Sequence, residues 1–235
     1  MSEFKEILRQ ELETQGFAPS EGELELCGIY RDFLLQKNAV MNLTAVTEDR
    51  AIAVKHFADS LFLLRYGNPA KGSSLLDIGS GAGFPGMVCK IFRPDLKITL
   101  MDSLAKRCSF LQELCAKLGF KDVTVLTGRA EEYGHNALYR GSFDYVTARA
   151  VASSAVLTEY GIPFLKQGGK LLLMKGKEED AVPLKALQEL GAEETANIPY
   201  ELQGDSRHLL TVVKICETAD KYPRRPGIPT KRPLL

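Results

Sequence analysis

The chain has 235 residues, of which 45% are hydrophobic and 26% are charged, and its formal net charge is zero. This composition is typical of a globular protein with a sizeable core, and no apolar stretch approaches the roughly 20 residues that a membrane-spanning helix needs. The acidic N-terminus also lacks the basic and then apolar pattern of a secretory signal. We therefore expect a soluble, cytoplasmic protein with no membrane partner.

The cysteines form an odd set without a Cys-x-x-Cys pair, and four of the five lie in apolar, periodic segments. That pattern favours reduced, buried thiols in a reducing compartment and gives no support for zinc or another metal. The five are Cys27, Cys89, Cys108, Cys115 and Cys216.

Apolar residues repeat at helical spacing through the first 66 residues, which predicts an N-terminal helical region. Within it, Glu48 to Tyr66 is expected to form one long helix, preceded by a loop at Asn42-Leu43-Thr44. A cluster of glycine, proline and asparagine at 67–72 marks the boundary of this region.

Short apolar runs then alternate with helical segments, which predicts an α/β fold with a mostly parallel sheet covered on both faces. Two further strands near 193–200 and 209–215 lie close together in sequence and predict an antiparallel hairpin at one edge. Seven strands are expected in all. The first five are Ser74–Ile78, Leu96–Met101, Val123–Leu126, Phe143–Thr147 and Lys170–Met174.

A glycine-rich turn follows the first strand and is the expected cofactor site. Gly79, Ser80, Gly81 and Gly83 form a tight turn whose backbone can lie against a ligand, between a strand and a helix. Asp77, two residues before the first glycine, is poorly matched to a diphosphate. An acid there suits the cationic methionine portion of S-adenosylmethionine, which favours a methyltransferase over an NAD-dependent dehydrogenase.

Two further positions complete the expected site. Asp102, at the end of the second strand, can accept hydrogen bonds from both hydroxyls of a ribose, although it can equally cap the following helix. Ala130 and Glu131, after the third strand, are placed to hold an adenine, or they simply begin a helix.

The end of the fourth strand bears on the methyl acceptor. It reads Thr147-Ala148-Arg149 and offers neither the cysteine nor the amide that methylation of pyrimidine carbon-5 or of an exocyclic amine uses. The amine-methylation string Asn197-Ile198-Pro199-Tyr200 occurs about fifty residues too late, in the expected hairpin. Guanine N7 carries a lone pair and no proton, so it needs positioning rather than a base, and no catalytic residue is assigned. Arg149 can hold a guanine edge, a phosphate or the cofactor carboxylate, or form a surface ion pair.

Several ordered motifs resemble the bacterial small-subunit rRNA guanine-N7 methyltransferases, the RsmG or GidB family. They run from about residue 30 to the C-terminus and include Asn42–Thr44, His56–Leu61, Gly79–Gly86, Gly128–Glu131 and Tyr222–Pro229. The resemblance implies a Rossmann-like methyltransferase domain behind a helical cap. It also implies methyl transfer from S-adenosylmethionine to N7 of one guanine in 16S rRNA, at position 527 of the standard rRNA numbering. By that family's pattern, cofactor contacts fall to Gly79, Phe84, Ala130, Glu131 and Arg149.

On this basis we expect a helical cap over 1–66, a methyltransferase domain over 67–220 and a basic, proline-rich tail over 221–235. Four prolines are expected to keep the tail extended, so that its cations follow a phosphate backbone, although a solvated tail is equally consistent. The candidate RNA contacts, each also consistent with a solvated surface residue, are Lys106, Arg107, Arg207, His208, Arg224, Arg225 and Lys231.

The expected partner is 16S rRNA, alone or within the small subunit or its precursor, and the protein is expected to be a monomer that does not bind DNA. The roles of His56 and Asp59, which share a helical face, stay open between lining a substrate cleft and packing the helices against the sheet. The competing functions are methylation of another acceptor and a non-catalytic RNA-binding role in ribosome assembly.

Overall fold

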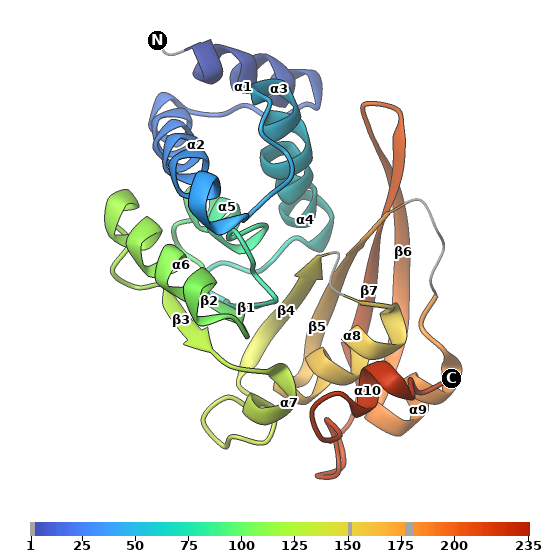
Figure 1. Ribbon diagram of the computed structural model, residues 1–235. Helices are drawn as coiled ribbons and strands as arrows, with labels where there is room; N and C mark the ends of the chain where they lie inside the picture. Colours follow the sequence, from blue (N-terminus) through green and yellow to red (C-terminus); the bar gives the residue numbers. More distant parts are fainter. Residues whose placement is uncertain (1–2, 150–151, 177–180) are drawn as a thin grey trace.

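The computed structural model describes residues 3–149, 152–176 and 181–235, and it places a helical N-terminal region beside a twisted sheet (Figure 1). The N-terminal elements are α1 (Glu3–Thr14), α2 (Glu21–Met41), α3 (Asp49–Ile52), the π-helical turn η1 (Ala53–Ala58) and α4 (Asp59–Gly67). Ser20 and Glu23 begin α2 with a reciprocal capping box, and Asn42 ends it in a left-handed conformation.

The expected single helix over Glu48 to Tyr66 contains a feature that periodicity did not predict. The helical run from α3 to α4 is continuous, but its middle widens into the π-helical turn η1. Such turns insert an extra residue and often occur at functional positions. His56 lies inside this turn and Asp59 directly after it.

The seven-stranded, mostly parallel sheet with an antiparallel edge hairpin is confirmed. Its order is β3-β2-β1-β4-β5-β7-β6, with the first five strands parallel and β7 antiparallel to both neighbours. The strands are β1 (Ser74–Ile78), β2 (Lys97–Asp102), β3 (Thr124–Thr127), β4 (Phe143–Arg149), β5 (Leu165–Lys175), β6 (Ala192–Leu202) and β7 (Asp205–Lys214). The strand order reverses between β1 and β4, which is where ligands bind in such sheets.

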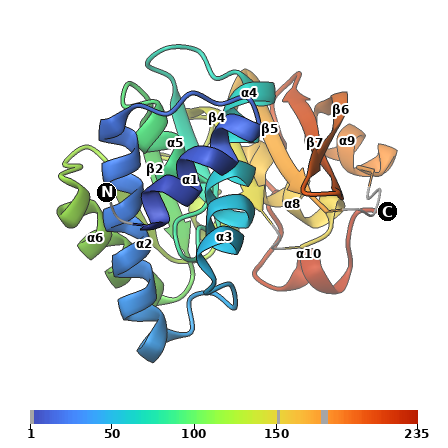
Figure 2. The same ribbon diagram turned by 90° about the horizontal axis from the view of Figure 1, so that it is seen from above.

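Helices cover both faces of the sheet, as the alternating pattern predicted (Figure 2). Side chains of one strand alternate between two hydrophobic clusters: Leu75 joins the cluster that includes the N-terminal helices, and Leu76 joins the other. On the first face lie α4, α5 (Gly86–Phe92) and α6 (Ala105–Leu118), with α1 and α2 packed beyond them. On the second lie α7 (Ala130–Tyr133), α8 (Ser154–Gly161), the 3-10 turn η2 (Ile162–Phe164), α9 (Leu184–Leu190) and α10 (Ile228–Lys231).

The C-terminal segment does not run extended as the four prolines suggested. It folds back along the second face of the sheet and includes the short helix α10, and Tyr222, Pro229 and Leu234 are buried. Burial of these apolar side chains outweighs the preference of proline for an extended chain. The prediction of an extended tail was therefore wrong.

Candidate active site

A cavity of about 250 Å³ lies at the carboxyl ends of β1, β2 and β3. This is the edge at which parallel sheets bind ligands, and the volume is close to the lower end of the roughly 300–1,000 Å³ usual for small-molecule sites. Its lining includes Gly79, Asp102, Ala130 and Glu131, four of the residues predicted for the cofactor. The other lining residues are Ile78, Met101, Ser103, Gly128, Arg129, Ala152, Tyr160 and Thr230.

A larger hollow, of about 480 Å³, opens at the opposite edge of the sheet. It is lined by the loop before β1 and by the first residues of β4 and β5, including Ser73, Asp144 and Lys166. Because it lies at the amino ends of the parallel strands, we assign the cofactor to the smaller cavity.

The first half of the glycine-rich turn is fastened to β2. The Gly79 and Ser80 amides both donate to the Met101 carbonyl, at 2.8 and 3.0 Å. The Ser80 hydroxyl donates to the Asp77 carbonyl at 2.9 Å and accepts from the Met101 amide at 3.1 Å. Ser80 is thus buried and supports the turn from inside rather than lining the cavity.

Asp77 also lies beneath the turn. Its side chain is fully buried, and Oδ2 accepts a hydrogen bond from the Gly86 amide at 3.0 Å, at the start of α5. Oδ1 is buried and has no hydrogen-bond partner among the described residues. Burial raises the pKa of Asp77 to about 6, partly offset by the Gly86 hydrogen bond. An unpaired oxygen at this point agrees with an attraction for a cationic ligand above it, although Asp77 does not itself line the cavity.

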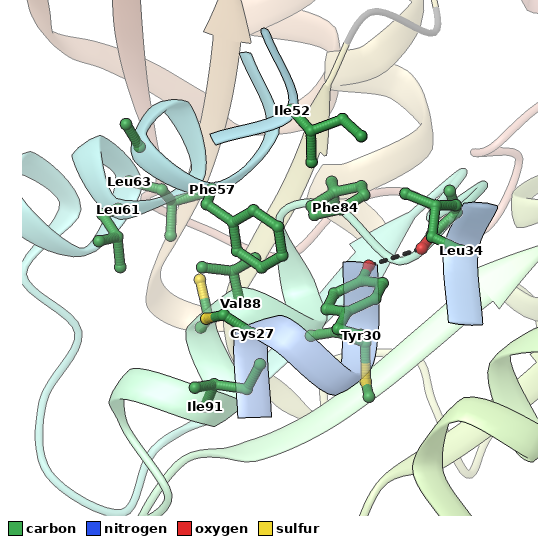
Figure 3. Packing of buried hydrophobic residues seen from close by; sticks show 14 of the residues in the cluster. Cys27, Tyr30, Leu34, Ile52, Phe57, Leu61, Leu63, Phe84, Val88 and Ile91 are labelled. Atoms are coloured by element: carbon green, nitrogen blue, oxygen red, sulfur yellow. Dashed lines mark hydrogen bonds between the residues drawn. The ribbon is translucent and has the colours of Figure 1, made fainter. Parts of the chain in front are cut away.

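The second half of the turn faces the N-terminal helices, as Figure 3 shows. The Tyr30 hydroxyl of α2 donates to the Ala82 carbonyl at 2.6 Å, and a Cβ on Gly83 would lie only 2.6 Å from that hydroxyl. The Phe84 ring is buried between the rings of Tyr30 and His56, at centroid distances of 4.8 and 4.5 Å. Gly83 and Phe84 therefore join the turn to the helices, and their predicted cofactor contacts stay predictions.

Asp102 accepts backbone hydrogen bonds at the start of α6 and from the glycine-rich turn, and its predicted contact with a ribose stays a prediction. Oδ1 accepts from the Leu104 amide at 2.9 Å, which helps to begin α6, and Oδ2 accepts from the Gly81 amide at 3.0 Å. Arg107 approaches Oδ2 at 3.4 Å. A carboxylate offers about four acceptor positions. Asp102 can therefore accept a further hydrogen bond from a ribose at the cavity wall.

Glu131 is buried on the other side of the same cavity, at the start of α7. Its Oε1 accepts hydrogen bonds from the Tyr160 hydroxyl of α8 and from the Gly227 amide, both at 3.1 Å. Tyr160 and Thr230 line the cavity. The sequence did not predict them because neither directly follows one of the first three strands, where the cofactor residues were expected. Burial raises the pKa of the Tyr160 phenol, so its hydroxyl stays protonated at neutral pH.

Arg149 points towards the helices rather than into the cavity. Its guanidinium donates to Asp59 Oδ2 at 3.0 Å and to the Lys55 carbonyl at 3.2 Å, and lies 5.5 Å from the centre of the Phe84 ring. Asp59 is almost fully buried and also accepts from the Tyr200 hydroxyl at 3.0 Å. The ion pair joins the end of β4, the helical region and the edge hairpin, and the proposed contact of Arg149 with the cofactor stays a prediction.

His56 and Asp59 therefore pack the helices against the sheet, one of the two roles left open for them. His56 Nε2 lies 2.9 Å from the Thr44 hydroxyl, and its Nδ1 is buried without a hydrogen-bond partner among the described residues. Burial and the nearby charge of Arg149 lower the pKa of His56 to about 4. The imidazole is neutral at physiological pH.

The candidate RNA-binding cations differ in their contacts and exposure, and Arg107 is paired with Asp102 as described above. Arg224 is held by the fully buried Glu159, and Arg207 lies 3.7 Å from Asp59. His208 contacts Asn197 on the neighbouring strand at 3.1 Å. Lys106 and Arg107 lie in the first turn of α6, shortly after the lining residue Asp102, and Lys231 directly follows the lining residue Thr230. Lys106, Arg225 and Lys231 are exposed.

The string Asn197-Ile198-Pro199-Tyr200 lies in the edge strand β6, as predicted. It does not line the cavity, and the Tyr200 ring stacks on Phe62 with 4.5 Å between the ring centroids. It packs the hairpin against α4.

The structure also bears on disulfides, metal sites and membrane-spanning helices. All five cysteines are free thiols, with only Cys216 exposed. Within residues 3–149, 152–176 and 181–235, no three His, Cys, Asp or Glu side chains are grouped to hold a metal ion. In the same ranges, no helix has both the length and the apolar character that a bilayer crossing requires.

Comparisons with known proteins agree with this arrangement. The family model described as rRNA small subunit methyltransferase G matches residues 23–210. A protein of that name from Lactococcus lactis subsp. lactis is 48% identical over 210 residues, covering 87% of this chain and 88% of the relative. Another, from Alkaliphilus metalliredigens, is 42% identical over 237 residues and covers 99% of each chain.

Solved structures match at the level of the fold. MtNAS in complex with MTA and tNA superposes with a TM-score of 0.58 at 12% identity, covering 91% of this chain and 86% of MtNAS. The antibiotic-resistance methyltransferase Kmr superposes with a TM-score of 0.52 at 15% identity, covering 66% of this chain and 92% of Kmr. The Rossmann-like methyltransferase fold is confirmed.

Proposed function

The chain belongs to the rRNA small subunit methyltransferase G family, and from that premise we propose that it methylates N7 of one specific guanine in 16S rRNA. It is an S-adenosylmethionine-dependent methyltransferase of small-subunit rRNA. The single guanine, its N7 acceptor atom and the form of the substrate are the parts that we propose.

The observation that carries the proposal is that two carboxylates, Asp102 and Glu131, share one cavity at the carboxyl ends of β2 and β3. Asp102 retains acceptor capacity for ribose hydroxyls, and the start of α7 at Ala130 offers backbone amides to an adenine. Asp77 Oδ1, which has no hydrogen-bond partner among the described residues, favours a positive charge near the turn. These residues fit S-adenosylmethionine.

When bound, S-adenosylmethionine supplies an electrophilic methyl group. The contribution of the chain is to hold that group in line with the acceptor, because N7 of guanine has a lone pair and no proton to remove. The described end of β4 agrees with this chemistry. The Thr147 hydroxyl is buried and donates to the Leu172 carbonyl at 2.9 Å, and Arg149 is paired with Asp59. Neither residue is a general base.

We further propose that the enzyme acts as a monomer in the cytoplasm, on the small ribosomal subunit or its precursor, and binds neither DNA nor membranes. The exposed cations Lys106, Arg225 and Lys231 support contact with a phosphate backbone, and Lys231 directly follows Thr230, which lines the cofactor cavity. On this proposal their role is to position the RNA and not to take part in the chemistry.

The test is methyl transfer from labelled S-adenosylmethionine to small-subunit particles from cells lacking the gene, with naked 16S rRNA assayed in parallel. We expect 7-methylguanosine at one site, identified by nucleoside mass analysis. Particles from cells that contain the gene are the matched control and should accept no label. Label in another nucleoside would overturn the acceptor, and cofactor binding without any label in RNA would favour the ribosome-assembly role.

A further inference from the structure

The C-terminal segment, residues 221–235, is anchored to the molecule by an ion pair between Arg224 and the buried Glu159. The Arg224 guanidinium donates to both carboxylate oxygens of Glu159, at 2.6 and 2.8 Å, and the Arg224 amide donates to the same carboxylate at 2.8 Å. Glu159 lies on α8 and is fully buried. A bidentate, charge-assisted contact of this kind fixes the direction of the chain as well as its position. The segment is therefore held against α8.

From this anchor the segment reaches the cofactor cavity. The Gly227 amide donates to Glu131 Oε1 at 3.1 Å, and three residues later Thr230 of α10 lines the cavity itself. The Tyr160 hydroxyl lies 3.1 Å both from the Thr230 hydroxyl and from Glu131 Oε1. Figure 1 shows α10 lying beside α8, the helix that carries Tyr160. Two hydroxyls and one carboxylate thus meet at one wall.

We propose that Tyr160 and Thr230 bind the adenine portion of the cofactor, so that the C-terminal segment forms one wall of the cofactor site. This inference rests on the proposed function. Glu131 takes the Tyr160 proton, since its Oε1 accepts from the Tyr160 hydroxyl. The Thr230 hydroxyl then donates to the Tyr160 oxygen, and both hydroxyl oxygens keep acceptor positions that match the exocyclic amine of an adenine.

The proposal changes what the basic segment does. Its interior contacts, through Arg224, Gly227 and Thr230, serve the cofactor, while the exposed cations Arg225 and Lys231 point to solvent. Charge alone left open whether the segment binds RNA or is simply solvated. Only its exposed side is free for that role.

The experiment measures the affinity of the full-length protein for S-adenosylhomocysteine and for adenosine by calorimetry. Thr230→Val keeps the shape but removes the hydroxyl, and we expect it to weaken both ligands about threefold to tenfold, as the loss of one hydrogen bond implies. Thr230→Ser keeps the hydroxyl and should bind within twofold of the wild type. Thr124→Val, the same substitution at an exposed position of β3, is the matched control and should change neither affinity.

Tyr160→Phe gives a second, independent reading if the valine variant is unstable, with Tyr66→Phe in α4 as its control. We expect Tyr160→Phe to weaken both ligands to a similar extent. Wild-type affinity in both Thr230→Val and Tyr160→Phe would overturn the inference, and so would an equal loss in Thr230→Ser and Thr230→Val. Failure of the wild-type protein to bind S-adenosylhomocysteine would instead overturn the proposed function.

Discussion

The glycine-rich turn between β1 and α5 has two sides, and its residues are required for different reasons on each. On the cavity side, Gly79 lines the site and the Gly81 amide donates to Asp102, so the backbone itself forms the ligand surface. On the packed side, Gly83 and Phe84 lie against Tyr30 of α2. One short motif therefore both forms the cofactor site and attaches the helical region to the sheet.

The comparison shows that glycine in a binding motif is not evidence of ligand contact at each position. A Cβ on Gly81 would meet nothing closer than the Gly79 carbonyl at 3.8 Å. A Cβ on Gly83 would clash with the Tyr30 hydroxyl at 2.6 Å and lie in tight contact with Met87 and Leu111. Gly81 is needed for its backbone conformation, with φ of +58°. Gly83, with φ of +98°, is needed for close packing as well. The two sides should respond differently to mutation.

The largest expected effect is on stability at the packed side. We predict that Gly83→Ala lowers the free energy of unfolding by about 3 kcal/mol, because it combines a strained backbone with overpacking. Gly81→Ala, the matched substitution on the other side, should cost only about 1 kcal/mol, because it meets open space. Urea unfolding of both variants measures the difference.

A second substitution, at Tyr30, tests whether the clash causes the loss of stability in Gly83→Ala. The nearest atom to the new Cβ is the Tyr30 hydroxyl oxygen, at 2.6 Å. Tyr30→Phe should therefore recover part of the loss in a double-mutant cycle with Gly83→Ala. Equal destabilisation by Gly81→Ala and Gly83→Ala would break the comparison between the two sides.

The sequence predicted those features of the fold and the site that depend on local patterns. Local patterns of apolar runs and glycines predicted the strands, the mostly parallel sheet and the edge hairpin. The position of Asp102 at the end of the second strand predicted its place at the cavity. Four predicted cofactor residues do line one cavity, because the carboxyl ends of neighbouring parallel strands meet there.

What the sequence could not predict depends on contacts between distant segments. Tyr200 bonds to Asp59 across 141 residues, and Arg224 bonds to Glu159 across 65. No local period encodes such pairs. One signal was available, because Glu159 is an acid in a mainly apolar helix and a buried charge requires a partner. The direction of Arg149, towards Asp59 rather than the cavity, had no comparable signal.

The second prediction concerns affinity on the cavity side. Asp102→Asn removes the charge that we expect to hold the ribose, and should weaken binding of S-adenosylhomocysteine by about tenfold to a hundredfold, the usual range for hydrogen bonds to a charged group. The Asn side chain still offers one oxygen to the Gly81 or Leu104 amide, which limits the loss of stability. Calorimetry measures the dissociation constant.

Asp32→Asn, at an exposed position on α2, is the control for Asp102→Asn and should leave affinity unchanged. If Asp102→Asn binds as tightly as the wild type, Asp102 acts only as a helix cap. A loss confined to unfolding free energy would place Asp102 with the packed residues and remove the contrast between the two sides.

A pH dependence is expected on the packed side, at His56. Its pKa falls from 6.5 to about 4 on folding, so its contribution to stability is fully present above pH 6.5 and is lost as the pH falls through 4. We predict that wild type loses about 2 kcal/mol relative to His56→Phe between pH 7 and pH 4.5. Asp77, whose pKa rises from 3.8 to about 6, changes stability in the opposite direction, but it is present in both proteins and cancels in the difference. Urea unfolding at the two pH values gives that difference, and a value independent of pH would mean that the imidazole becomes charged in the folded protein as readily as in the unfolded chain.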